Sequence, residues 1–356
     1  MTTQPPPLQD NLPLHDYEPR SRLALAETSV LKPRFPVIDA HNHLGEEFGG
    51  GWINRPVEEL LDVLDQAGVK MLFDMDGGWG EQVLQQHLDH FRNAAPERFV
   101  HFGGVEWNQW PELGNRFGEW AAARLEAQAR RGAQGLKIWK KLGLEVQDHE
   151  GHRVAVDDPR LDPIWSTAAE LGLPVLIHVA DPVAFFDPLD PSNERWEELH
   201  THPDWRFPSP PFPPFRSIVD ALARLVYRHP RTTFIGAHVG CYAENLAWVG
   251  DLLDRAPNFY VDIAARIAEL GRQPYTARKF FLRHADRILF GTDIAPMVPV
   301  YHTYYRFLET EDEYFSYEPW PIPGQGRWAI YGLFLPDEVL QKVYSGNAER
   351  VILHHP

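Results

Sequence analysis

Two histidines separated by one residue end the apolar segment VIDAHNH at residues 37–43. Because side chains alternate between the two faces of a strand, Asp39, His41 and His43 are expected to point the same way. Two imidazoles with this spacing at a strand end can bind one metal ion as adjacent ligands. The chain contains 17 histidines, so a hydrogen-bonded pair without a ligand is the alternative for this segment taken alone.

Three further apolar segments also end in an ionisable residue. His178 ends the segment PVLIH, His238 ends FIGAH and Asp293 ends ILFGTD. An ionisable side chain at the end of a buried strand costs free energy unless it binds something. One such residue is usually satisfied within the core, but four strands with this ending predict a shared site.

An α/β fold is indicated by eight short apolar segments that alternate with helical patterns. Several of these segments are almost wholly apolar, which is typical of parallel strands buried on both faces. Eight strands favour a closed (β/α)8 barrel, or TIM barrel, which carries its chemistry at the carboxyl ends of the strands. The expected strands are 37–43, 71–75, 100–106, 135–139, 174–179, 233–238, 259–263 and 288–293, and the expected helices are 56–67, 114–131, 162–171, 215–228, 246–255 and 275–284.

The pattern divides the chain into an arm and one domain. Residues 1–34 are rich in proline and polar groups and predict an N-terminal arm, whereas residues 35–356 predict a single barrel catalytic domain. Two long segments, 181–214 and 295–335, follow the fifth and eighth strands and contain many prolines and aromatic residues. Long loops of this kind usually cover a site, so we expect both at the mouth of the barrel.

Composition limits the partners of the protein. The chain of 356 residues has a formal net charge of −16, which disfavours binding to nucleic acid phosphates. Its single cysteine, Cys241, cannot form an intrachain disulfide, which fits a reducing compartment. No apolar run approaches the ~20 residues needed to span a bilayer, and the N-terminus lacks the apolar core of a secretory signal. We therefore expect a soluble, cytoplasmic protein that acts on a small molecule and binds neither nucleic acid nor membrane.

The combined motifs resemble those of the amidohydrolase superfamily, and more narrowly its amidohydrolase-2 branch, which is typified by aminocarboxymuconate-semialdehyde decarboxylase. They are DAHNH at 39–43, IHVAD at 177–181, GAHVG at 236–240 and FGTD at 290–293, and SGNAERV at 345–351 resembles the start of the C-terminal helix of that branch. The resemblance extends from about residue 36 to residue 352. It implies a (β/α)8 barrel, one divalent metal ion, most often zinc, and an assembly that in this branch is often a homodimer.

The resemblance also implies roles for individual residues. His41 and His43 of the first strand, His178 of the fifth and Asp293 of the eighth correspond to the metal ligands. His238 corresponds to the histidine of the sixth strand, which in the one-metal branch acts in acid–base or electrophilic catalysis. From the chemistry alone, Asp39 could orient a ligand histidine, or it could be a hydrogen-bonding group at the end of the strand.

Residues near the strand ends are candidates for binding the substrate. Lys137 lies in the fourth strand, where some members of the superfamily carry a carbamylated lysine that bridges two metal ions; we favour one metal, with Lys137 as an anchor for an anion. Arg266, just after the seventh strand, could bind a carboxylate through two hydrogen bonds, or form a surface ion pair. Trp52, Trp79 and Trp139 follow strands one, two and four and could wall the pocket, or belong to the core.

Three functions remain open at this point. The first is a hydrolase, in which metal-bound hydroxide attacks a small ester, lactone or amide that carries a carboxylate, Asp293 takes the proton and His238 assists the leaving group. The second is a non-oxidative decarboxylase or lyase that acts on an aromatic or enol carboxylate. The third is a barrel that binds a ligand without catalysis. We favour the hydrolase.

Overall fold

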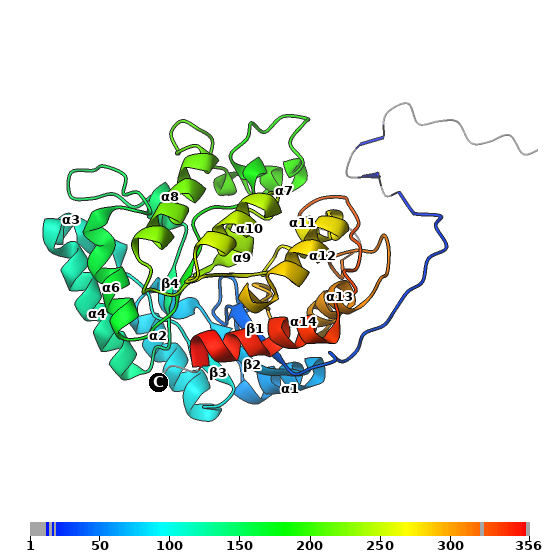
Figure 1. The fold of residues 1–356 in the computed structure, drawn as a ribbon, viewed down its shortest axis with the longest axis horizontal. Helices are drawn as coiled ribbons and strands as arrows, with labels where there is room; N and C mark the ends of the chain where they lie inside the picture. The colour runs from blue at the N-terminus through cyan, green and yellow to red at the C-terminus, as the bar shows by residue number, and fades with distance from the viewer. Residues whose placement is uncertain (1–11, 14–15, 18, 321–323, 354–356) are drawn as a thin grey trace, which may run out of the picture.

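The computed structural model describes residues 12–13, 16–17, 19–320 and 324–353. Eight parallel strands alternate with helices that surround them (Figure 1), so the predicted (β/α)8 barrel is confirmed. The strands are β1 (Val37–Asn42), β2 (Val69–Asp74), β3 (Phe99–His101), β4 (Leu136–Ile138), β5 (Val175–Ile177), β6 (Phe234–Gly236), β7 (Phe259–Asp262) and β8 (Ile288–Leu289).

Two groups of paired strands are joined into the closed barrel. One sheet has the order β1-β2-β3 and the other β4-β5-β6-β7-β8, and a bridge between Gly103 and Leu136 links β3 to β4. At the other seam, the amide of Ala40 donates to the carbonyl of Phe290 at 2.9 Å. Each strand therefore delivers its carboxyl end to one common mouth.

The helices of the structure begin and end close to the predicted positions. For example, α8 begins after Pro214 and ends before the His229-Pro230 pair, and it buries Ile218, Leu222 and Leu225 on one face. The helices are α1 (Val57–Ala67), α2 (Glu81–His87), α3 (Trp110–Leu113), α4 (Phe117–Arg131), α5 (Lys141–Leu144), α6 (Asp162–Glu170), α7 (Trp196–Thr201), α8 (Phe215–Arg228), α9 (Ala237–Gly240), α10 (Leu246–Arg255), α11 (Ile267–Arg272), α12 (Pro274–Arg283), α13 (Val298–Glu309) and α14 (Asp337–Gln341).

Inside the barrel, apolar side chains from the strands form a core that excludes water. Ile38 and Ala40 of β1 lie in this inner cluster together with side chains from most of the other strands, and Val351 and Ile352 of the C-terminal segment join it. A larger cluster lies between the strands and the surrounding helices. The strands are thus buried on both faces, as their apolar sequences predict.

The structure differs from the sequence analysis in the first strand. The pairing of β1 with β2 is irregular between Asp39 and Asn42, so the expected alternation of side chains is interrupted there. Asp39 accepts a hydrogen bond from the hydroxyl of Tyr301 in α13 at 2.8 Å, and does not hold a histidine ring. The interpretation of Asp39 as a residue that orients a ligand histidine is therefore wrong.

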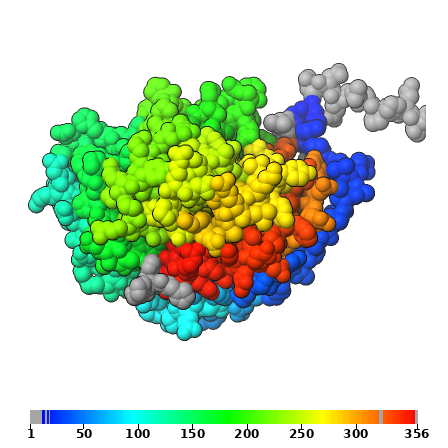
Figure 2. Space-filling view, viewed as in Figure 1, coloured from blue at the N-terminus to red at the C-terminus, as the bar shows by residue number. Residues whose placement is uncertain are grey.

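The described part of the N-terminal segment lies on the outside of the barrel, beside α13 and α14 (Figure 2). Thr28 bonds Asp312 through both its amide and its hydroxyl, at 2.7 Å each, and the Arg34 guanidinium bonds Asp337 at 2.7 Å. Residues 19–29 are otherwise exposed. The division into an arm and a single domain stays a prediction. Within the described residues, no helix has the length and apolar character that crossing a membrane requires.

Candidate active site

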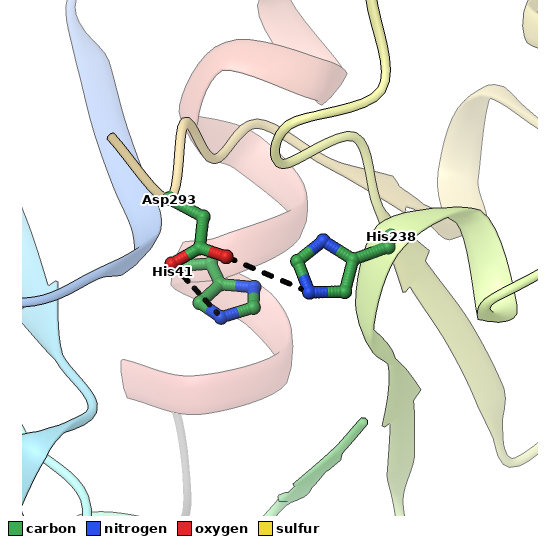
Figure 3. A group of neighbouring side chains, drawn as sticks. All are labelled: His41, His238 and Asp293. Carbon is green, nitrogen blue, oxygen red and sulfur yellow. Dashed lines mark ion pairs between the residues drawn. The ribbon is translucent and has the colours of Figure 1, made fainter. Parts of the chain in front are cut away.

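Three side chains from different strands converge at the mouth of the barrel (Figure 3). His41 comes from β1, His238 follows β6, and Asp293 follows β8. Asp293 Oδ1 lies 3.9 Å from His41 Nε2, and Asp293 Oδ2 lies 3.6 Å from His238 Nε2. One ligand atom from each residue lies within 4.8 Å of the other two, which is close enough for a shared metal ion.

His43 joins this group from the other side of Asp293. Its Nε2 atom lies 3.2 Å from Asp293 Oδ1, and its ring lies edge-on to His41 with centroids 5.9 Å apart. Although burial opposes the positive charge, Asp76 and Asp293 raise the pKa of His43 to about 9. The carboxylate of Asp293 therefore contacts a second imidazole of the first strand.

The other ring nitrogen of each histidine is bound to an acceptor. His41 Nδ1 lies 2.9 Å from Asp262, His43 Nδ1 lies 2.6 Å from Asp76, and His238 Nδ1 lies 2.8 Å from the carbonyl of Ala264. A neutral histidine that donates through Nδ1 carries its lone pair on Nε2. His41 and His238 thus present Nε2 lone pairs beside Asp293, whereas His43, whose pKa is raised, would present one only after losing its proton on metal binding. The contacts at Nδ1 are those of metal-binding histidines held by outer carboxylates or carbonyls. The residues fit a divalent metal.

Burial reinforces the neutral state of two of these rings. The pKa of His41 and that of His238 lie well below the ordinary value, chiefly because burial penalises the charged imidazolium. In contrast, neighbouring histidines hold the pKa of Asp293 well below its usual range, although burial opposes the charge. Neutral imidazoles and an ionised carboxylate are the forms that bind metal.

Unusual backbone conformations bring two of these residues into place. His238 and Asp293 have φ angles of 58° and 51°, in the left-handed region that non-glycine residues rarely adopt. The amide of His238 donates to Asp262 at 2.8 Å, and the amide of Asp293 donates to the carbonyl of His41 at 2.9 Å. At Gly291, a Cβ atom would lie 2.9 Å from that of His41. Strain of this kind concentrates at functional sites.

His178 lies at the edge of the group. Its ring centroid is 4.4 Å from that of His238, and its Nε2 atom lies 3.4 Å from Asp181 Oδ1. Burial lowers the pKa of His178 to about 4, so the ring is neutral. Its buried Nε2 has no hydrogen-bond partner among the described residues. An unpaired nitrogen of this kind is consistent with the predicted ligand role, which stays a prediction.

Lys137 lies inside the group. Its Nζ atom is 2.9 Å from His41 Nε2, and the side chain is 1% exposed. Burial lowers the pKa of Lys137 to about 8. The ammonium also lies 4.8 Å from the ring centroid of Trp139. Lys137 thus lies beside His41, one of the proposed metal-binding histidines. Its predicted contact with a substrate anion stays a prediction.

The site opens into a pocket of about 580 Å³ with an aromatic wall. Trp79 and Trp139 stack with centroids 4.0 Å apart, and Trp139 in turn stacks on His43 with centroids 5.0 Å apart. Trp52 has the core position that was the alternative given for it. It is buried in the outer core with the guanidinium of Arg55 over its ring, and it is not among the pocket-lining residues described.

Arg266 lines the same pocket from the segment after β7. The residue is 7% exposed, and its guanidinium donates to the carbonyl of Ala265 at 2.8 Å. Among the described residues, no carboxylate lies within 4.0 Å of that guanidinium. The surface ion pair that was the alternative for Arg266 is therefore absent from the described part of the chain.

Two residues that hold the histidine rings were missed in the sequence analysis. Asp262 ends β7 in the same way as the strand-end residues that were recognised, so the same pattern could have found it. Asp76 lies just after β2, where it bonds His43 and accepts from the amides of Leu44 and Gly45 at 2.9 and 2.6 Å. Its role depends on how the loops after β1 and β2 meet.

A closed (β/α)8 barrel with this donor group at its mouth defines a metal-dependent barrel enzyme. Residues 38–352 match the amidohydrolase family Amidohydro_2, and the chain belongs to that family. The family resemblance of the sequence is thus confirmed.

Solved structures of low identity share the fold. A 2,6-dihydroxybenzoate decarboxylase from Rhizobium matches with a TM-score of 0.56 and 17% identity, covering 89% of this chain and 98% of that chain. A putative amidohydrolase from Staphylococcus aureus matches with a TM-score of 0.56 and 16% identity, covering 89% and 99%. A dihydroxybenzoic acid decarboxylase from Polaromonas, with bound manganese and 2-nitroresorcinol, matches with a TM-score of 0.54 and 17% identity, covering 89% and 97%. No curated protein matches this chain.

Proposed function

We propose that the protein is a metal-dependent, non-oxidative decarboxylase of an aromatic or enol carboxylate. The observation that carries this proposal is the buried Arg266, a cation that has no carboxylate within ion-pair distance among the described residues and that lines the same pocket as His238 and Asp293. A buried charge is costly unless it is paired, so an anionic substrate group would complete the site. The decarboxylases among the structural relatives favour this reaction over the hydrolysis expected from sequence.

The proposed donor set extends the one implied by the motifs. His41, His238 and Asp293 would hold the ion, with His43 and His178 as further ligands on either side. Imidazoles and one carboxylate suit zinc, the ion that the motifs imply, whereas manganese is bound in the Polaromonas relative. Either ion, when bound, supplies a Lewis acid for oxygen atoms of the substrate.

The chain's own residues can position the substrate. Arg266 offers guanidinium donors that match the two oxygens of a carboxylate. The stacked rings of Trp79 and Trp139 offer a flat apolar wall for the ring of an aromatic acid. A bound aromatic acid would therefore lie between the guanidinium of Arg266 and the group formed by His41, His238 and Asp293.

The proposed reaction needs a proton for the carbon that loses the carboxylate. The bond from the ring carbon to the carboxylate breaks, its electron pair stays on the carbon, a proton is added there and carbon dioxide leaves. Asp293 is 21% exposed through its side chain, compared with 0–3% for His41, His43 and His238, so it is the member of the group most open to the pocket. Because Asp293 is ionised, we assign it the relay of the proton: its carboxylate accepts a proton from a solvent water and passes it to the carbon, and the hydroxide that remains combines with the carbon dioxide as bicarbonate.

The test is an assay of carbon dioxide release from a panel of hydroxybenzoates and aromatic dicarboxylates by the purified, metal-containing protein. An ester and lactone hydrolysis assay is run on the same preparation. We expect carbon dioxide release from at least one acid, abolished in Asp293→Asn. Hydrolysis of esters or lactones without release of carbon dioxide from any acid would overturn the proposal.

Hydrolysis remains the second candidate because of one feature of Asp293. Its ionised carboxylate lies between the Nε2 atoms of His43 and His238, where it could equally accept a proton from an attacking water. The substrate would then be a carboxylated ester, lactone or amide whose anionic group binds Arg266. The paired assays above separate the two reactions.

A further inference from the structure

A second polar group lies in the pocket wall, on the segment that follows β5. Arg195 is 1% exposed and forms an ion pair with Glu269 of α11. The same guanidinium donates to Glu198 Oε2 at 2.8 Å, and Glu198 lies in α7. Arg195 and Glu198 both line the pocket that contains the metal-type cluster.

The hydrogen bonds of Glu198 leave one oxygen unused. Oε2 is taken by Arg195, whereas Oε1 accepts no hydrogen bond from any residue that the structure describes. The side chain is 11% exposed and lines the pocket, so this oxygen can be reached by a ligand bound there. Because Arg195 is already paired with Glu269, its neutralisation does not require Glu198. The second carboxylate therefore needs another explanation.

Glu198 lies in a partly buried place between two arginines. Burial raises the pKa of Glu198 to about 7, although Arg195 and Arg266 act in the opposite direction. Above that pH the carboxylate is charged, and a ligand that supplies a donor to its unpaired oxygen gains a charge-assisted hydrogen bond. Its neighbour Glu197 differs, since both of its oxygens bind Arg327, at 2.7 and 2.8 Å, away from the pocket lining.

We infer that Glu198 determines substrate specificity by accepting a hydrogen bond from a hydroxyl or amino group on the ring of the carboxylate substrate. This inference rests on the proposed function, because the carboxylate itself is assigned to Arg266 at the same pocket. The substrate class is thus narrowed to aromatic acids that carry a hydrogen-bond donor, rather than plain or alkylated benzoates. A site built to bind such a donor discriminates strongly against analogues that lack it.

Binding can be measured without turnover, through quenching of the pocket tryptophans. The probes are benzoate, the three monohydroxybenzoates and the three monoaminobenzoates, titrated into the purified protein as isolated. We expect at least one hydroxy or amino isomer to bind about tenfold or more tightly than benzoate, as for hydrogen bonds to charged groups. If no isomer binds more tightly than benzoate, the inference is overturned.

The decisive variant is Glu198→Gln. Arg195 has only donors, so the amide oxygen would face Arg195 and the NH₂ group would face the pocket. The advantage of an amino isomer over benzoate should therefore fall to about twofold or less, with benzoate affinity unchanged. Glu198→Asp, which keeps the charge beside Arg195 but withdraws it from the pocket, should give the same loss. The matched control Glu197→Gln should keep the full discrimination.

The outcomes separate this inference from the proposed reaction. Discrimination lost in Glu198→Gln but kept in Glu197→Gln supports the specificity role even if no carbon dioxide is released. Carbon dioxide release together with unchanged discrimination in Glu198→Gln and Glu198→Asp overturns the specificity role alone. Absence of binding by every probe, benzoate included, overturns the specificity role, and the carbon dioxide assay then decides the proposed reaction separately.

Discussion

The Nζ atom of Lys137 lies 2.9 Å from Nε2 of His41, the same nitrogen that faces Asp293 at the centre of the donor group. A positive charge at this distance competes with a metal cation for the same lone pair. Since burial lowers the pKa of Lys137 to about 8, the ammonium form is increasingly lost above that pH. Metal binding should therefore be weaker when Lys137 is protonated and stronger when it is neutral.

Replacing this lysine should strengthen metal binding at neutral pH. In Lys137→Met the competing charge is removed while the apolar stem is kept, so we expect the Kd for zinc or manganese at pH 7 to fall by about tenfold. In the wild-type protein, affinity should rise as pH increases through about 8, and this rise should be smaller in the variant, where only the deprotonation of His43 still contributes. Metal titrations at pH 6.5, 7.5 and 8.5 measure both effects. An unchanged pH dependence in Lys137→Met would show that another group controls binding.

Metal content also distinguishes two roles for His238. The motifs imply that His238 acts on the substrate, whereas the structure places it within 4.8 Å of His41 and Asp293. We expect His238→Ala and Asp293→Ala each to lose more than about tenfold in metal affinity, because each removes one direct ligand. Metal analysis after purification is the measurement, with the exposed His200→Ala as the control. Full metal retention by His238→Ala would return this residue to a purely catalytic role.

The barrel and most of the donor group could be predicted from the sequence because both depend on local pattern. Apolar segments buried on both faces identify the strands, and polar residues at their ends identify the mouth. The strand ends were less certain. β6 ends at Gly236 and β8 at Leu289, so His238 lies in the short α9 and Asp293 lies in the irregular segment after β8.

Features that depend on distant contacts could not be predicted in the same way. The orientation of His43 by Asp76 requires two loops to meet, and the burial of Trp52 depends on how the segment after β1 packs. The pairing of Arg195 with Glu269 joins residues separated by 74 positions. The period-two rule failed at Asp39 because a local irregularity in β1 has no clear sequence signal.

Arg266 provides a direct test of carboxylate binding. In Arg266→Gln the cation is removed, so KM for the carboxylate substrate should rise by about tenfold to a hundredfold, as for the loss of a charged hydrogen-bonded pair. Arg266→Lys should recover only part of this loss, because an ammonium cannot form the paired contact of a guanidinium. Steady-state kinetics on the acid that releases carbon dioxide measure both variants. The control is Arg283→Gln, which changes an exposed arginine paired with Asp254. An unchanged KM in Arg266→Gln would mean that the substrate carboxylate binds elsewhere.

A buried ion pair beside the barrel gives a pH-dependent prediction for stability. Asp74, at the end of β2, receives hydrogen bonds at one oxygen from His87 at 2.6 Å and from His101 at 2.9 Å. Although burial opposes both charges, His87 and His101 hold the pKa of Asp74 well below its ordinary 3.8, and Asp74 raises the pKa of His87 above its ordinary 6.5. Both shifts mean that the folded state stabilises the charged pair.

The direction of each pKa shift sets the pH range in which Asp74 and His87 stabilise the folded state. The ionised carboxylate of Asp74 contributes to the free energy of unfolding above about pH 3.8, and this contribution is lost as pH falls below that value. The charged ring of His87 contributes fully below about pH 6.5, and its contribution is lost as pH rises through the raised pKa. Asp74→Asn should therefore lower the free energy of unfolding by about 3–5 kcal/mol near pH 5.5, because it leaves a buried histidine without its counter-ion. Urea denaturation of the wild type and of Asp74→Asn at pH 5.5, 7 and 9 measures the loss in the free energy of unfolding, with the solvent-facing Asp62→Asn as control. We expect this loss to become smaller as pH rises. A loss that does not depend on pH would mean that the pair is not charged.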